Sequence, residues 1–355
     1  MGKTGFVDSS EEPAAQRKPR TDGGVRPVTI AYIAESAGVS VPTVSKVING
    51  RSGVSADTRA RVEELINRYG YQKPLAANRS NIVELVFREL THMWAVEIIR
   101  GVEQVARSNR IGVMVSQFGL HDSSEAPAWD DTIARQPRAV LSVAQMSASE
   151  RAELEAKGIP FVVFDPVDDL PADTPFVGST NWSGGRAAGR HLTELGHRRI
   201  AMISGPDHLF CRARRDGFRA AVEAAGLTLD PALEVTAQLS RDDGYAAATA
   251  LLARPDRPTA IFASNDLQAL GVYQAARAAG LRIPDDLSVV GFDDVPVVAW
   301  VDPPLTTVHQ PLTEMAVAAT ELALALARGE KTAQIGLEIA TSLVVRESTA
   351  PPTIR

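Results

Sequence analysis

The chain has a single cysteine and no long hydrophobic run. Cys211 alone cannot form an internal disulfide, and no cysteines stand at the spacing of a zinc finger. The first 26 residues hold no apolar segment of the signal-peptide kind, and no later apolar run is long enough to cross a bilayer. These absences predict a cytoplasmic protein in a reducing compartment, without a membrane partner.

Motifs that would indicate catalysis are also missing. The chain has no Gly-x4-Gly-Lys-Ser/Thr phosphate-binding loop, no Gly-x-Ser-x-Gly elbow and no pair of histidines at helical spacing. Asp293 and Asp294 are adjacent, and because adjacent side chains usually diverge we do not interpret them as an acid–base pair. We interpret Cys211, which lies close to Arg212 and Arg214, as an unreactive thiol. The sequence therefore predicts no enzyme, no cofactor and no metal site.

Charge is divided unevenly along the 355 residues. Residues 27–80 carry seven Lys and Arg against four acidic residues, whereas residues 81–355 carry 25 against 35. A basic segment on an acidic body can contact phosphates at one end without binding polyanions elsewhere. The length predicts a small domain and a larger one of two lobes.

Residues 28–50 predict two short helices joined by a glycine turn. Thr29 can cap the first helix, whose apolar residues recur at spacings of three and four and form one buried face: Ile30, Ile33, Ala34 and Ala37. Gly38 ends that helix, and Ser40 can cap the second. Residues 54–66 add a third helix with its own cap. Together they predict a helix-turn-helix, whose second helix can lie in a DNA major groove.

The motifs of this segment resemble the headpiece of the LacI/GalR family of transcriptional regulators: Ala37-Gly38-Val39-Ser40, Thr43-Val44-Ser45, Asn49-Gly50, Val54-Ser55 and Thr58-Arg59. The resemblance continues to about Ser348, through motifs that include Ser264-Asn265-Asp266, Val290-Gly291-Phe292-Asp293-Asp294 and Pro304-Leu305-Thr306-Thr307-Val308. It implies a sequence-specific DNA-binding regulator, most often a repressor of carbohydrate-utilisation genes. Such a protein binds a pseudo-palindromic operator as a homodimer under the control of a small-molecule effector, and localises with the bacterial nucleoid.

The resemblance places base-edge contacts at Val41, Pro42 and Lys46. Lys46 can donate to guanine acceptors, whereas Val41 and Pro42 offer only apolar contact, for example to a thymine methyl group. The other DNA contacts that we expect, mostly to phosphates, come from Thr29, Thr43, Ser45, Asn49, Ser55, Thr58 and Arg79. The alternative interpretation of these residues is a solvated helix face.

Four segments are predicted along the chain. Residues 1–26 form a disordered arm, which either touches the DNA backbone or is merely solvated, and residues 27–72 form the headpiece. Residues 73–81 form a linker that is shorter than the hinge segment usual in the family. Leu75 is the candidate for a minor-groove wedge, but the spacing argues against a standard hinge helix. Residues 82–355 form the core.

Short apolar runs alternate with amphipathic segments through the core, as strands and helices of doubly wound parallel sheets do. We predict a first lobe at about 82–179 plus part of 300–325, and a second at about 180–300 plus part of 326–348. The strands expected in them are 82–87, 111–116, 139–143 and 161–164, then 200–204, 233–236, 260–263 and 287–292, with one more at 342–346. This α/β core resembles the type I periplasmic sugar-binding fold, in which ligands bind between the lobes.

In that cleft the resemblance predicts effector contacts from Trp94, Asp165, Arg214, Asn265 and Asp293. Carboxylates and amides pair with vicinal hydroxyls, a guanidinium donates to oxygen atoms, and a tryptophan can stack on a pyranose. The alternative is that the charged residues are buried and pair with one another. We expect Trp182 and Trp300 to be packing residues. An aromatic residue that the family commonly has near Leu239 is missing, which weakens the sugar assignment.

The effector that the resemblance favours is a mono- or oligosaccharide, although some relatives bind purines or nucleosides. A solute-binding transport protein would need a secretion signal and no headpiece. A sugar-processing enzyme would need catalytic groups that the sequence does not reveal. A constitutive architectural DNA binder would differ in having a cleft that no longer controls DNA affinity.

Overall fold

The computed structural model describes residues 28–48, 52–69, 79–88, 90, 93–117, 128–330, 332 and 334–353. Asn49, of which a DNA contact is expected, Leu75, the candidate wedge, and the first 26 residues, which either touch DNA or are solvated, lie outside these ranges. The chain divides into two compact units, Met1–Lys73 and Pro74–Arg355. Within the described ranges no helix has the length and apolar character that spanning a membrane requires.

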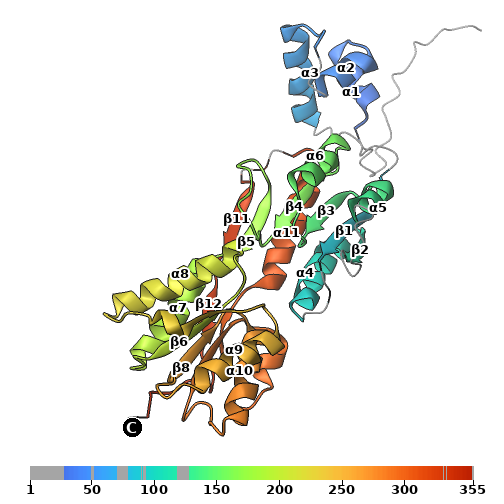
Figure 1. The fold of residues 1–355 in the computed structure, drawn as a ribbon. Helices are drawn as coiled ribbons and strands as arrows, with labels where there is room; N and C mark the ends of the chain where they lie inside the picture. The colour runs from blue at the N-terminus through green and yellow to red at the C-terminus, as the bar shows by residue number, and fades with distance from the viewer. Residues whose placement is uncertain are drawn as a thin grey trace, which may run out of the picture. The chain divides into compact units, whose positions relative to one another are not determined.

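The first unit contains α1 (Ile30–Ala37), α2 (Val41–Ile48) and α3 (Ala56–Tyr69), drawn in blue in Figure 1. The Oγ1 of Thr29 accepts a hydrogen bond from the Tyr32 N–H at 3.3 Å and caps α1. Gly38 ends the helix with φ of 67°, a left-handed conformation that favours glycine. The apolar spacing in the sequence closes a small core of Ile33, Ala34, Ala37, Val44, Val47 and Val62.

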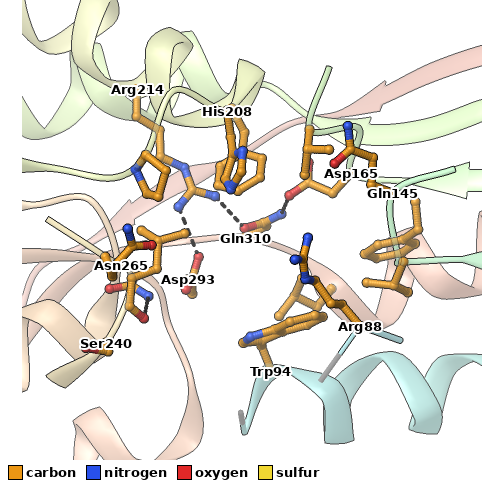
Figure 2. A pocket seen from close by; sticks show the side chains of 18 residues that line it. Arg88, Trp94, Gln145, Asp165, His208, Arg214, Ser240, Asn265, Asp293 and Gln310 are labelled. Carbon is orange, nitrogen blue, oxygen red and sulfur yellow. Dashed lines mark hydrogen bonds and ion pairs between the residues drawn. The ribbon is translucent and has the colours of Figure 1, made fainter. Parts of the chain in front are cut away.

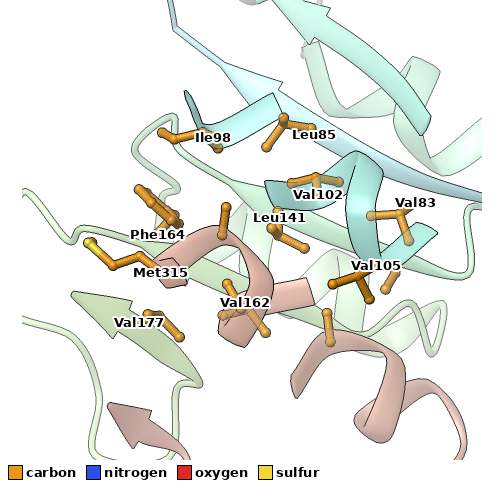
Figure 3. Close-up of a cluster of buried hydrophobic side chains, with 14 of the residues drawn as sticks. Val83, Leu85, Ile98, Val102, Val105, Leu141, Val162, Phe164, Val177 and Met315 are labelled. Atoms are coloured by element: carbon orange, nitrogen blue, oxygen red, sulfur yellow. The ribbon is translucent and has the colours of Figure 1, made fainter. Parts of the chain in front are cut away.

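Lobe 1 of the second unit is a six-stranded parallel sheet in the order β11-β5-β4-β3-β1-β2. Its strands are β1 (Ile82–Phe87), β2 (Gly112–Gln117), β3 (Ala139–Ser142), β4 (Phe161–Phe164), β5 (Phe176–Ser179) and β11 (Gly336–Ile339). Its helices are α4 (Trp94–Ser108), α5 (Ala128–Arg135), α6 (Ala148–Ala156) and α11 (Leu312–Ala327). Figure 3 shows the core between the sheet and helices α4 and α11, with Leu85, Leu141, Phe164 and Met315 in it.

Lobe 2 repeats this plan in the order β12-β10-β9-β8-β6-β7, with the edge strand β12 antiparallel to its neighbour. Its strands are β6 (Ile200–Ser204), β7 (Glu234–Thr236), β8 (Ala260–Ala263), β9 (Ser288–Asp293), β10 (Thr306–His309) and β12 (Ser342–Val344). Its helices are α7 (Asn181–Glu194), α8 (Leu209–Ala224), α9 (Arg241–Leu252) and α10 (Asp266–Ala278), with short 3-10 turns at Pro231–Leu233 and Pro296–Ala299.

The chain passes between the lobes after β5, after β10 and after β11. The sequence predicts neither β5, β10 nor β11, because β5 and β11 are four-residue strands that include a glycine and β10 is a four-residue strand rich in threonine. Two of the crossings are joined directly. The Thr341 N–H donates to the Oγ1 of Thr180 at 3.0 Å, and the Thr341 hydroxyl donates to the Thr180 carbonyl at 3.1 Å.

Candidate functional site

Helix α2 presents one exposed face and one buried face. Val41, Pro42 and Lys46 are exposed, whereas Val44 and Val47 face the small core. The three residues assigned to base edges therefore share the solvent side of one helix. A helix that exposes a cation between apolar groups has the chemistry to read base edges in a major groove.

Four of the five hydroxyl groups assigned to DNA contacts in the headpiece, those of Thr29, Thr43, Ser55 and Thr58, take part in local capping pairs. The Oγ of Ser40 accepts from the Thr43 N–H at 3.3 Å and lies 2.9 Å from the Thr43 hydroxyl. The Oγ of Ser55 likewise accepts from the Thr58 N–H at 3.3 Å and donates to the Thr58 hydroxyl at 2.8 Å. These bonds cap α1 at Thr29, α2 at Ser40 and α3 at Ser55. A phosphate contact from these hydroxyl groups would be an additional role.

Arg79 lies in the second unit and is engaged by the core. Its guanidinium donates to the carbonyl of Arg138 at 3.5 Å and to that of Gly158. The adjacent Ser80 hydroxyl donates to the Arg135 carbonyl at 2.7 Å. These bonds anchor the start of the core, and Arg79 would have to leave them to meet a phosphate. The DNA contact expected of Arg79 therefore stays a prediction. Its hydrogen bonds to the core give it a structural role that was not predicted from the sequence.

A cavity of about 390 Å³ lies between the two lobes. Lobe 1 contributes Trp94 and Asp165, and lobe 2 contributes Arg214, Asn265 and Asp293. The structure thus brings all five effector residues expected from the sequence to one cavity, although they span 200 positions of the chain (Figure 2). The volume is within the range of about 300–1,000 Å³ that is usual for small-molecule sites.

Arg214 is the centre of this cavity's hydrogen-bond network. Its Nε donates to the Asn181 Oδ1 at 2.8 Å, and its Nη1 donates to the Ser264 carbonyl at 2.7 Å and to the Asp293 Oδ1 at 3.4 Å. Its Nη2 donates to the Gln310 Oε1 at 3.0 Å. These bonds use four of the five N–H groups of the guanidinium, which leaves one donor for a ligand.

Two features of lobe 2 hold the Arg214 side chain in place. Its guanidinium carbon lies 3.6 Å from the ring centroid of Phe292 and 5.1 Å from that of Phe210, so that the planar group contacts two aromatic faces. Gly185 on α7 allows α8 to approach closely, because a Cβ there would lie 2.0 Å from the Arg214 carbonyl oxygen. Arg214 is consequently 2% exposed and preorganised.

Gln310 joins the two lobes and was not predicted from the sequence. It lies on the crossing after β10, accepts from Arg214 and donates through Nε2 to the Asp165 Oδ2 at 3.1 Å. Asp165, Gln310, Arg214 and Asp293 therefore form one chain of polar contacts from lobe 1 to lobe 2 (Figure 2). The sequence signal for Gln310 is weak, since it is one polar residue in a short connection before Pro311.

The two carboxyl groups of this network are both affected by burial. Burial raises the pKa of Asp293 to about 7, against the opposing effect of Arg214 and with a further increase from Asp165. Burial also raises the pKa of Asp165, which Arg214 and the hydrogen bond from Gln310 partly offset. Both residues have positive φ, 47° for Asp165 and 109° for Asp293, conformations that are unfavourable outside glycine and that concentrate at functional sites.

Asn265 has a structural task as well as a place at the cavity. Its Oδ1 accepts from the Gln268 N–H at 2.9 Å and caps α10, and its Nδ2 donates to the Leu239 carbonyl at 3.1 Å. One N–H of the amide remains for a ligand. The ligand role of Asn265 is therefore limited to a single donated bond, and it stays a prediction.

Trp94 contacts both lobes. Its ring lies 5.8 Å from that of Phe87 in lobe 1, and it packs against the apolar core of each lobe while lining the cavity. Two other tryptophans, Trp182 and Trp300, differ from the packing role expected of them. Trp182 is 46% exposed beside Arg186, and Trp300 is 75% exposed because it follows a short surface turn.

Several lining residues were not identified from the sequence because their positions depend on the meeting of separate loops. They are Arg88, Gln145, His208, Phe210, Gln238, Ser240 and Gln310. Leu239 lines the cavity at the place where an aromatic residue was expected. Cys211 is buried, and burial raises its pKa to about 11, so that its thiol is not a nucleophile. Within the described part of the chain, no group of acidic, histidine and cysteine side chains could hold a metal ion.

Comparison with known proteins adds two family matches. Residues 29–73 match the bacterial regulatory proteins of the lacI family, and residues 190–349 match the periplasmic binding protein-like domain. The chain is similar to the HTH-type transcriptional regulator DegA of Bacillus subtilis (strain 168), at 33% identity over 91% of this chain and 98% of DegA.

Two solved structures resemble the whole chain. The complex of the transcriptional regulator CelR with cellobiose is 32% identical, with a TM-score of 0.68 over 91% of this chain and 100% of that one. The lac repressor dimer bound to operator and the anti-inducer ONPF is 27% identical, with a TM-score of 0.65 over 92% of this chain and 100% of that one. The match to each therefore includes the helix-turn-helix as well as the two lobes.

Proposed function

The chain belongs to the LacI family of bacterial regulatory proteins, and on this premise we propose that it represses carbohydrate-utilisation genes under the control of a sugar bound between its lobes. Like its relatives, it is a DNA-binding transcriptional regulator and not an enzyme. We place it on DNA in the bacterial cytoplasm, as a homodimer in which each headpiece contacts one half of a pseudo-palindromic operator.

One observation carries the effector assignment. A buried guanidinium that contacts two aromatic rings bonds one carboxyl group directly and a second one through Gln310, at a cavity that both lobes line. Donors and acceptors in this arrangement suit the vicinal hydroxyls of a sugar, and Trp94 offers an apolar face for its ring. A ligand that contacts both lobes favours one arrangement of the lobes and so changes the affinity for operator DNA. By thermodynamic linkage, operator DNA changes the affinity for the ligand by the same factor.

The effector assignment is tested by calorimetric titration of the full chain with monosaccharides, disaccharides, purines and nucleosides, alone and with a selected operator duplex. We expect a sugar to bind with an affinity that changes when operator is bound. A purine or nucleoside as the only ligand would replace the sugar assignment. Sugar binding that operator leaves unchanged would remove the allosteric part of the proposal.

The DNA contact is tested by replacing Lys46 with alanine. Loss of a base-edge donor should reduce discrimination between operator and random DNA by about 1–3 kcal/mol, measured by fluorescence anisotropy at fixed salt. Arg68→Ala is the matched control, since it removes one exposed positive charge from α3 without changing α2. Equal discrimination in both variants would exclude Lys46 as a base reader.

A further inference from the structure

The cleft continues into lobe 1 beyond the residues around Arg214. A second cavity of about 180 Å³ adjoins the first, and the two share the residues Val143, Gln145, Phe164, Asp165 and Val167. Four of these shared residues belong to the two loops that follow β3 and β4, at the carboxyl ends of parallel strands, and the fifth, Phe164, is the last residue of β4. The second cavity is several times the roughly 30 Å³ that one water molecule occupies, so it is more than a solvent-sized gap.

The walls of this second cavity combine polar and apolar groups. Gln145 donates through Nε2 to the Asp168 Oδ2 and so connects the two loops, and Arg151 donates to the Met146 carbonyl at 2.6 Å. Asp168 is exposed, and its carboxylate can accept further hydrogen bonds. Met146 and Leu170 contribute apolar surface beside these groups. Amide, carboxylate and guanidinium groups around an apolar surface are the chemistry that binds a ring with hydroxyl substituents.

A third cavity adjoins the second one, since both are lined by Asp165, Pro166, Asp168, Asp169 and Leu170. It shares only Asp165 and Phe210 with the main cavity, and it is bounded by Leu209, whose N–H donates to the Val167 carbonyl at 2.7 Å. That backbone bond connects the start of α8 in lobe 2 to the loop after β4 in lobe 1. The second cavity shares five residues with the main cavity and the third shares two, so the main cavity extends into lobe 1 past Gln145 and through the second cavity. Figure 2 shows Gln145 at the opposite end of the main cavity from Asn265 and Ser240.

We propose that the second cavity is a subsite for a second sugar ring, so that the effector is a disaccharide or longer oligosaccharide. One ring lies between Trp94 and the Arg214 network, and the next lies against Gln145 and Asp168. This inference rests on the proposed function, since it assigns the second ring of a sugar effector. In this arrangement the first ring binds to both lobes, and the second ring binds to lobe 1 alone.

The test compares disaccharides with their component monosaccharides on the full chain. Cellobiose, maltose and xylobiose are titrated calorimetrically beside glucose and xylose. We expect a disaccharide to bind at least about tenfold more tightly than its component monosaccharide, the effect of one or two hydrogen bonds to charged groups. Asp168→Ala should bring the two affinities close together by weakening the disaccharide alone, whereas Gln145→Ala, at a residue that lines both cavities, should weaken the disaccharide more than the monosaccharide.

Asp173→Ala is the matched control, because Asp173 is an exposed carboxylate of the same connection between β4 and β5 that lines none of the three cavities. Asp168→Asn keeps the side-chain volume and an acceptor, and should retain part of the disaccharide preference. Tight monosaccharide binding that a second ring does not improve would overturn the subsite and leave the proposed function standing. Binding of no sugar by the parent protein would overturn both.

Discussion

At Arg214 and Asn265 the wall of the cleft that lobe 2 provides is buried and largely hydrogen-bonded, whereas the wall that lobe 1 provides is more open at Arg88 and Gln145. Arg214 and Asn265 are 2% and 6% exposed and already have protein partners, while Arg88 and Gln145 in lobe 1 are exposed. A desolvated, preorganised wall contributes affinity without an ordering cost on binding. If the cleft binds a sugar as proposed, we expect lobe 2 to supply most of the affinity and lobe 1 to decide which sugar binds.

Removing Arg214 should have the largest effect on this comparison. Arg214→Ala leaves Asp293 and Asp165 without their cation, and we expect a loss of about 3–5 kcal/mol in unfolding free energy, measured by denaturant titration. Sugar affinity should fall by about 10- to 100-fold, as the loss of one hydrogen bond from a charged group predicts. Arg214→Lys should not restore binding, because an ammonium cannot contact both aromatic faces and several acceptors.

The neighbouring Arg212 provides the control for this prediction. It lies on the same helix and pairs at 3.5 Å with Asp207, a side chain that is 81% exposed. Arg212→Ala should change stability by less than about 1 kcal/mol. If Arg214→Ala lowered the unfolding free energy as little as Arg212→Ala, the Arg214 network would not be a preorganised part of the lobe 2 wall.

The raised pKa of Asp293 predicts that stability falls as pH increases. Between the ordinary pKa of 3.8 and about 7, the folded chain holds a proton on Asp293 that the unfolded chain has released. The unfolding free energy should therefore fall with pH in that window, by up to about 1.4 kcal/mol per pH unit for this group. Thermal or denaturant unfolding at several pH values measures the slope.

Asp293→Asn separates this contribution from that of the rest of the site. Burial also raises the pKa of Asp266, with a further increase from Asp293, so the variant should show a shallower slope, not a flat profile. Sugar hydroxyls donate to the ionised form, and sugar affinity should increase as pH rises through about 7 in the parent protein only. An identical slope in parent and variant would contradict the assignment.

The smallest of these effects is expected from the lobe 1 wall at Trp94. Trp94→Ala removes apolar area that lines the cavity and contacts the apolar cores of both lobes, and should weaken sugar binding by about tenfold. Trp94→Phe should recover much of that affinity. Trp300→Ala, at an exposed residue that lines none of the three cavities, should leave it unchanged. If Trp94→Ala lowered sugar affinity more than Arg214→Ala does, the lobe 1 wall would contribute more affinity than the lobe 2 wall, which would contradict the comparison.

The headpiece illustrates what could be predicted from the sequence. Its helices depend on contacts between residues three or four positions apart and on caps such as Thr29, so that local spacing is enough to place them. The central strands of both lobes were predictable for a similar reason, since buried parallel strands are continuous apolar runs. Family resemblance supplied the five effector positions, which the fold places around one cavity.

Tertiary structure alone decided the details of the cleft. Gln310 contacts Arg214 and Asp165, which lie 96 and 145 positions away in the sequence. Phe292, on β9, contacts Arg214, on α8. The short strands β5, β10 and β11 take their places from neighbouring strands and not from their own residues. The sequence by itself therefore determined the fold class, the helix-turn-helix and the regulator family. Which groups meet between the lobes was decided by packing, because such contacts leave no periodic trace in the chain.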